Sequence, residues 1–308
     1  MHRTIEATVD PAKTAAIVAA LTRHPHVMGL SLLPGASLKP VGDLVQIQVL
    51  NRGTDDVLSI IQKESASSPF SISTAEIASL IDPDRQEVIN KDVDEAVWEE
   101  VEAGLRHNGR LTPNFLLLMA IGGIITAIGF VSDMQNQVIA FIAASIIAPG
   151  LEPLAKLPLG IVLRKRECLF LGFRASITGY SVMLLAATAT FYLLQQLGDA
   201  TPQLFLEGEF TKSLCSIKPK DWGMSIAASA ASILMYLSYR RNVIAGPLIA
   251  LILIPATCAT GISLLLGEWE MAGQISKRMG AELLVTVGVG ILVIYLKQLM
   301  VHKRKPIV

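Results

Sequence analysis

Long uncharged segments between Leu111 and Leu296 constrain the fold of this chain more than any other feature. Five of them contain no charged residue, and a sixth contains only Glu282. The six segments are 111–132, 134–151, 175–198, 222–239, 242–267 and 279–296. Because a helix that spans a bilayer needs roughly 20 mostly apolar residues, they predict six membrane spans. The lipid bilayer is therefore the first partner that we expect.

The charges divide the chain into two parts. Only 17% of the 308 residues are charged, whereas soluble proteins have about a quarter. Residues 1–111 carry 16 acidic and 10 basic residues, and residues 112–308 carry 10 acidic and 16 basic ones. This split predicts an acidic soluble domain before a membrane domain. We expect the boundaries to be 1–82 for the soluble domain, 83–111 for a linker, 112–298 for the spans and 299–308 for a basic tail.

The soluble domain shows alternating strand and helix patterns. Strands are predicted at 3–9, 27–33, 44–50 and 70–76, and helices at 12–23 and 54–65. In the third strand, Val45, Ile47 and Val49 alternate with glutamines, which is typical of a half-buried strand. The order βαββαβ predicts a ferredoxin-like α+β domain, a fold that hosts many functions.

Two helix details follow from the same patterns. The helix at 12–23 is expected to bury Ala15, Val18, Ala19 and Thr22, and the helix at 54–65 to begin at a Thr54 cap. Residues 84–106 are expected to form one amphipathic helix that packs on protein, because valines and Leu105 recur every four residues from Val93.

Several chemistries are not indicated. Cys168, Cys215 and Cys258 show no CxxC spacing, so they do not indicate a zinc site. His24 and His26 could bind a metal, but no third ligand lies near them in the sequence. The motifs Gly-x-Ser-x-Gly and His-Glu-x-x-His are absent. We therefore expect no metal, no cofactor, no nucleic-acid partner and no enzymatic activity, and leave a homo-oligomer open.

The loop charges predict an orientation. If every segment crosses once, tight basic clusters such as Arg164-Lys165-Arg166 gather on one side. The positive-inside rule makes that side cytoplasmic, together with both termini, so we expect a multi-pass membrane protein. If residues 138–163 instead form a re-entrant hairpin, every later loop changes side.

Prolines predict broken helices within the membrane part. Pro149, Gly150 and Pro153 lie in one apolar segment, and Pro255 lies in another. Proline removes an N–H donor and clashes with the preceding turn, so we expect a break or a strong kink at both places. Aligning Pro149 with Pro255 leaves three spans in each half, which favours an inverted repeat of three plus three helices.

Charged residues coincide with the first break. An ionisable group in a span is costly to bury and usually faces the interior, and Glu152 and Lys156 have the i, i+4 spacing of a helical pair. They form either a structural ion pair or an ion or substrate site. Further candidates for that site are Thr257, Cys258 and Thr260 in the facing segment, and Glu282 in the last span. Hydrogen bonds to the preceding helical turn are the alternative role of each hydroxyl group.

The segment AFIAASIIAPGLEPLAKLPLGIVLRKRE resembles the domain-of-unknown-function 389 family of bacterial membrane proteins. A second segment, IAGPLIALILIPATCATGISLLLGEWEMAG, is similar to the later proline-containing part of that family, and together the resemblance covers about 112–298. The family commonly has a Pro-Leu-Met-Gly-Pro-like run where this chain has Pro149-Gly150-Leu151-Glu152-Pro153. The resemblance implies a bacterial inner-membrane protein and no particular activity.

The sequence thus favours a secondary transporter or permease for an ion or small solute, with its site at the proline-broken helices. The alternative is a membrane sensor or scaffold that does not transport, whose soluble domain binds a regulatory ligand. Six spans with charges at helix breaks are more than an anchor requires, so transport ranks first.

Overall fold

The computed structural model describes residues 2–66, 68–238 and 245–301. The chain forms two compact units, one built mainly from Met1–Glu100 and the other from Val101–Tyr236 and the residues up to Val301. The first contains a four-stranded antiparallel sheet, and the second is helical.

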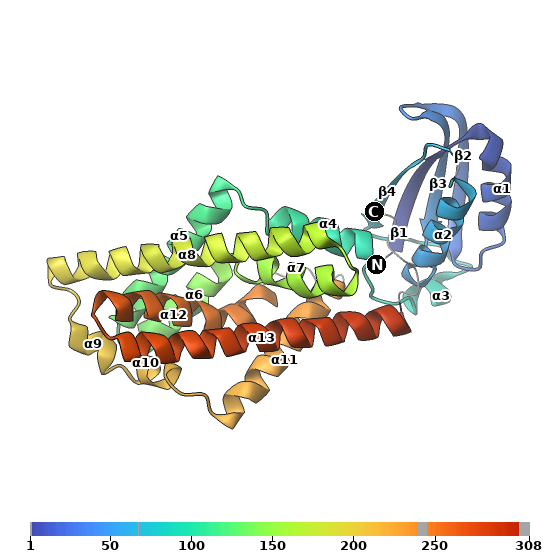
Figure 1. Ribbon diagram of the computed structural model, residues 1–308. Helices are drawn as coiled ribbons and strands as arrows, with labels where there is room; N and C mark the ends of the chain where they lie inside the picture. Colours follow the sequence, from blue (N-terminus) through green and yellow to red (C-terminus); the bar gives the residue numbers. More distant parts are fainter. Residues whose placement is uncertain (1, 67, 239–244, 302–308) are drawn as a thin grey trace. The chain divides into compact units, whose positions relative to one another are not determined.

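The sheet unit has the predicted order βαββαβ. Its elements are β1 (His2–Val9), α1 (Pro11–Thr22), β2 (Val27–Leu38), β3 (Val41–Val49), α2 (Asn51–Glu64) and β4 (Ser71–Ile77) (Figure 1). The strands lie in the order β2-β3-β1-β4, and every neighbouring pair is antiparallel. This is the ferredoxin-like arrangement, with both helices against the sheet.

The predicted alternation in β3 is confirmed. Val45, Ile47 and Val49 are fully buried, whereas Gln46 and Gln48 are exposed on the other face of the sheet. Because successive side chains of a strand point to opposite faces, one face forms the core and the other remains polar.

The predicted face of the first helix and the predicted start of the second were wrong. In α1 the buried residues are Thr14, Ile17 and Leu21, and Ala15 and Ala19 are exposed. Isoleucine and leucine bury more apolar surface than alanine, so they decide which face packs. Helix α2 begins at Asn51, three residues before Thr54, and Leu50 at its N-cap has no capping side chain.

A distant residue explains the early start of α2. The Asp92 carboxylate accepts hydrogen bonds from the backbone N–H groups of Asn51 at 2.6 Å and Arg52 at 3.3 Å. These groups have no partner inside the helix, and an acidic group at a helix N-terminus satisfies them and interacts favourably with the helix dipole.

The same contacts interrupt the helix expected at 84–106. The structure has α3 (Gln86–Asn90) and α4 (Trp98–Asn108), with no helix between Lys91 and Val97. The Asp92 carboxylate binds the N–H groups at the start of α2, and the Asn51 side chain donates to the Val93 carbonyl oxygen at 2.8 Å. A backbone held by these tertiary hydrogen bonds cannot also make the helical ones.

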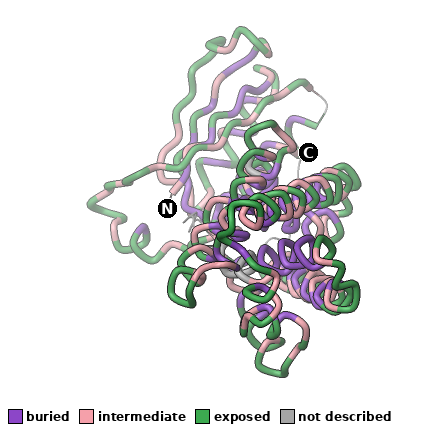
Figure 2. The backbone as a smooth tube through the Cα atoms, turned by 90° about the vertical axis from the view of Figure 1, so that its left-hand side faces the viewer, coloured by how far each residue is buried: buried purple, intermediate pink, exposed green. Residues whose placement is uncertain are grey.

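The helical unit contains several apolar helices. After α4 they are α5 (Pro113–Phe130), α6 (Met134–Ile147), α7 (Leu151–Val162), α8 (Arg166–Leu197), α9 (Pro202–Leu206), α10 (Glu209–Leu214), α11 (Pro219–Leu237), α12 (Ala245–Leu265) and α13 (Trp269–Met300). Figure 2 shows buried residues on the helix sides that face one another and exposed residues outside.

Three helices in the described ranges, α5, α8 and α13, are long and apolar enough to cross a membrane. The pair α6 and α7, bent by 52°, counts as a fourth if it is one span. These helices indicate a membrane protein. Helix α11 covers most of the predicted span 222–239 but does not meet the same criterion, and residues 242–244 of the fifth predicted span lie outside the described residues.

Helix α12 lies at the centre of the unit. It packs against α5, α6, α8 and α13, and every residue from Leu253 to Ser263 is buried. The Arg278 guanidinium group of α13 donates to the Ser213 and Ser216 carbonyl oxygens at 2.6 and 2.7 Å. This holds the segment between α8 and α11 against α13.

We predict that Asp92→Asn destabilises the sheet unit. The Asp92 side chain is 2% exposed, and hydrogen bonds to a charged acceptor contribute about 2 kcal/mol each. Hydrogen exchange of the full-length protein, followed by mass spectrometry, should show faster exchange in β1 and β3. The control is Asp84→Asn, which should leave exchange unchanged. Asp84 is exposed and forms no ion pair with the described residues.

The stabilisation of the sheet unit by Asp92 should depend on pH. Burial by itself raises the pKa of the Asp92 carboxyl group, but hydrogen bonds from the Asn51 and Arg52 N–H groups outweigh it and hold the pKa below its usual value. The stabilisation is therefore complete above about pH 3.9, the usual pKa of aspartate, and is lost as the pH falls through the lowered value. Equal acid sensitivity of wild type and Asp92→Asn would contradict this.

Candidate functional site

The chain breaks between α6 and α7, beside Pro149. Ala148 has extended backbone with ψ of 122°, as a residue before proline prefers. The Tyr180 hydroxyl group of α8 donates to the Gly150 carbonyl oxygen at 3.2 Å, so a carbonyl group near the break has a protein partner. Pro153 lies in the first turn of α7, where its missing N–H costs little.

The second expected break is absent. Helix α12 continues through Pro255 as one helix. The residues around Pro255 are buried by the neighbouring helices, and such packing supports a proline-containing helix in a membrane protein. The first segment differs because Gly150 follows Pro149 directly.

Glu152 lies in the first turn of α7, near the break. Its Oε2 atom is buried and has no hydrogen-bond partner. The residues on either side, Leu151 and Pro153, are also buried. An unpaired carboxylate oxygen in an apolar setting is costly, so it marks a position where a proton or a cation can bind.

Lys156 does not pair with Glu152. Its side chain is 2% exposed, and its Nζ atom donates to the Gly109 carbonyl oxygen at 2.6 Å. Among the described residues, no ion pair joins the two side chains within 4.0 Å. The i, i+4 spacing predicted a pair, but the turn between α4 and α5 offers the lysine a buried acceptor instead. The structural ion pair is therefore wrong.

Glu282 lies in a second polar cluster, between α11, α12 and α13. It is 3% exposed, and its Oε1 atom has no hydrogen-bond partner. Together with Ser225, Ser229 and Thr286 it lines a cavity of about 10 Å³, roughly the space of one water molecule. Ser229 donates to Thr286 at 3.3 Å, and the Ser225 Oγ atom also lacks a partner.

The sequence analysis did not identify the two serines. Ser229 lies in the run of small residues 227–231 on α11, which suits close helix packing, and Ser225 lies between Met224 and Ile226. Nothing in their spacing points to Glu282, which follows more than fifty positions later. The one charged residue in the segment 279–296, Glu282, was the only feature of the sequence that pointed to this cluster.

The candidate hydroxyl groups of α12 are used within the helix. Thr257 donates to the Leu253 carbonyl oxygen at 2.7 Å and Thr260 to that of Ala256 at 2.8 Å. Cys258 is fully buried. No hydrogen bond in the described ranges joins these three residues to Glu152 or Glu282. They belong to the packing of α12 rather than to either carboxyl group.

One apolar cluster adjoins both carboxyl groups. Leu151 and Leu154 of α7 pack with Ala228 and Leu253, which also line the Glu282 cavity, and Leu283 lies against the same cluster. The candidate site thus consists of two carboxyl groups with apolar side chains between them. In the described part of the chain, no group of three His, Cys, Asp or Glu residues could hold a metal ion.

Comparison with known proteins gives one family. Residues 145–296 match the family model described as domain of unknown function (DUF389). No curated protein and no solved structure matches the chain. The match contains both carboxyl groups, the break beside Pro149 and helix α12. The segment that holds the candidate site is therefore similar to the DUF389 family.

Proposed function

We propose that the helical unit is a permease that moves a cation, H⁺ or Na⁺, alone or with a small solute. The observation that carries the proposal is that Glu152 and Glu282, both in apolar helices, each have a buried carboxylate oxygen without a partner. Inserting a charged group at the centre of a membrane helix costs roughly 3 kcal/mol on insertion scales. Such groups are therefore typically paired or functional.

The chemistry around Glu282 favours a small cation. The polar groups that line its cavity with it are hydroxyl groups, and hydroxyl and carboxylate oxygens are suitable ligands for hard cations. The cavity admits one water-sized particle and excludes a larger solute. A proton or a sodium ion could occupy it without any change in backbone.

The two carboxyl groups would act in sequence. A cation that leaves Glu282 would need the apolar cluster around Leu253 to open before it reached Glu152. Such an opening changes which carboxyl group is accessible, and this is the requirement of alternating access. Helix α11 suits this motion because it packs less closely against the other helices than α12 does.

The six spans, the orientation and the inverted repeat are part of the same proposal. Helices α8 and α13 are both 32 residues long and end the two proposed halves. At 1.5 Å per residue each is about 48 Å long, more than a hydrocarbon core of about 30 Å. Both carry three charged residues within their first ten positions, and this part of each helix would lie outside the hydrocarbon region.

We predict that Glu282→Gln reduces cation flux about tenfold or more, because the amide keeps the shape but cannot bind or release a proton or balance a cation. The measurement is H⁺ flux in proteoliposomes that contain pyranine, driven by a Na⁺ gradient or by a potassium diffusion potential. Glu152→Gln should also reduce the flux.

Glu268→Gln is the matched control, because Glu268 is exposed just before the same helix. Its flux should stay within about twofold of the wild type, as is usual for surface substitutions. Wild-type flux that survives both Glu152→Gln and Glu282→Gln would refute the site. Absence of wild-type flux under every gradient would favour the sensor alternative.

We also predict the sides of two loops. In a variant with Cys168, Cys215 and Cys258 replaced by serine, Arg166→Cys should react with an impermeant maleimide only after cells are permeabilised. Lys212→Cys should react in intact cells. Both positions are exposed. Reaction of Arg166→Cys in intact cells would mean that α6 and α7 form a re-entrant hairpin.

A further inference from the structure

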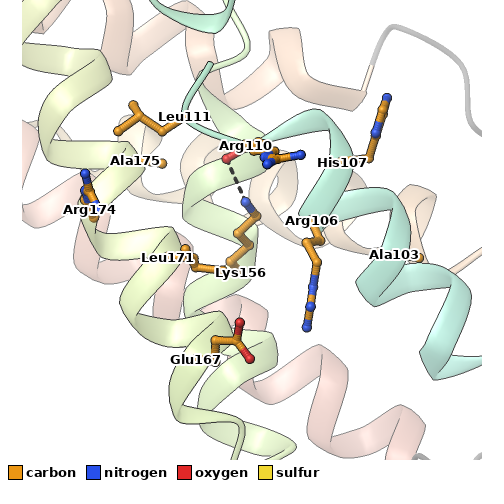
Figure 3. Close-up of a pocket in the computed structure, with 11 residues that line it drawn as sticks. Ala103, Arg106, His107, Arg110, Leu111, Lys156, Glu167, Leu171, Arg174 and Ala175 are labelled. Carbon is orange, nitrogen blue, oxygen red and sulfur yellow. Dashed lines mark hydrogen bonds between the residues drawn. The ribbon is translucent and has the colours of Figure 1, made fainter. Parts of the chain in front are cut away.

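A second pocket is lined by Lys156 and contains neither Glu152 nor Glu282. It has a volume of about 610 Å³ and lies between α4, the turn before α5, α7 and α8. Figure 3 shows the side chains of Arg106, Arg110, Lys156 and Arg174 around it. Its volume is typical of a site for a small molecule, for which the usual range is about 300–1,000 Å³.

The pocket carries an excess of positive charge. Four of its lining residues are arginine or lysine, and Glu167 is the one acidic residue among them. Arg106 is partly neutralised, because its Nη2 atom lies 2.7 Å from Glu102, which also pairs with Lys165. Arg110 and Arg174 have no ion-pair partner among the residues that the structure describes. Their guanidinium groups are therefore available to a ligand.

Lys156 is a fixed and buried part of this pocket. A Cβ atom on Gly109 would lie 3.1 Å from its Nζ atom, and one on Gly172 would lie 2.8 Å from its Cβ atom. The two glycines thus allow the α4–α5 turn and α8 to close around the lysine. Its single hydrogen bond, to Gly109, leaves two of its three donors for another acceptor.

The position of the pocket indicates where its ligand comes from. Arg110 directly precedes the uncharged segment that begins at Leu111, and Arg174 directly precedes the one that begins at Ala175. Helices α5 and α8 pack together, and both of these residues line the pocket. The pocket therefore lies where the apolar helices meet their polar ends, which is the level of phosphate groups in a bilayer.

The set of donors favours phosphate over other anions. Guanidinium groups bind phosphate oxygens through two parallel hydrogen bonds, and a lysine adds a compact charge. Several cations in one place suit a group that carries more than one negative charge, whereas a carboxylate would leave most of them unpaired. Leu111, Leu171 and Ala175 form an apolar wall beside the charges.

We propose that this pocket binds a phosphate group, carried either by a lipid headgroup or by a soluble phosphate compound. Arg110 and Arg174 bind the phosphate oxygens, and Lys156 holds the inner end of the site. The proposal does not depend on cation transport, because none of these residues lies in the Glu282 cavity.

The test measures binding to the full-length protein in detergent with two probes. One is inorganic pyrophosphate, titrated by calorimetry, and the other is phosphatidic acid in nanodiscs or mixed micelles, detected by native mass spectrometry. The variants are Arg110→Gln and Arg174→Gln, and each should weaken binding about tenfold, as expected for the loss of a charged hydrogen bond. Size-exclusion elution and circular dichroism check that each variant is folded.

Arg166→Gln is the matched control, since it removes the same charge from an exposed position of α8 that does not line the pocket. It should bind both probes as the wild type does. Sensitivity of pyrophosphate binding to Arg110 and Arg174 would identify a soluble ligand, and sensitivity of phosphatidic acid binding alone would identify a lipid. If neither probe depends on these two arginines, or if Arg166→Gln has the same effect, the proposal is wrong.

Discussion

Backbone groups without helical partners must be satisfied by protein when they lie among apolar helices, since no water is available there. The break between α6 and α7 creates such groups, and the turn between α4 and α5 adds another. Tyr180 satisfies the Gly150 carbonyl group, and Lys156 satisfies that of Gly109. The arrangement of charge in the helical unit depends on these two hydrogen bonds.

Because Lys156 is bound to Gly109, it is not available to Glu152. The acidic group therefore keeps an unpaired oxygen beside an apolar cluster, and the basic group joins Arg110 and Arg174 at the polar ends of the helices. The unit thus separates a region that suits cations from one that suits anions. Burial of an unpaired charge is expensive, so the Glu152 oxygen without a partner is a cost to the stability of the fold.

The parts of the sheet unit that depend on the spacing of neighbouring residues could be predicted from the sequence. Strand alternation at Val45, Ile47 and Val49 and the order βαββαβ follow from the spacing of apolar residues. The long helix expected at 84–106 failed because Asp92 and Val93 bind Asn51 and its helix, some 41 positions earlier in the chain. Periodicity does not contain such a contact, and a hydrogen bond to a helix N-terminus outweighs the propensity of a few residues.

The amino-acid sequence by itself determined the apolar segments, the sheet unit before them and the break beside Pro149, because hydrophobicity, side-chain period and the chemistry of proline act over a few neighbouring residues. Tertiary structure decided that α12 continues through Pro255, that Glu282 meets Ser225, and that Arg110 and Arg174 line one pocket. These outcomes depend on which helices pack together. Residues far apart in sequence become neighbours only when the helices bury their apolar faces.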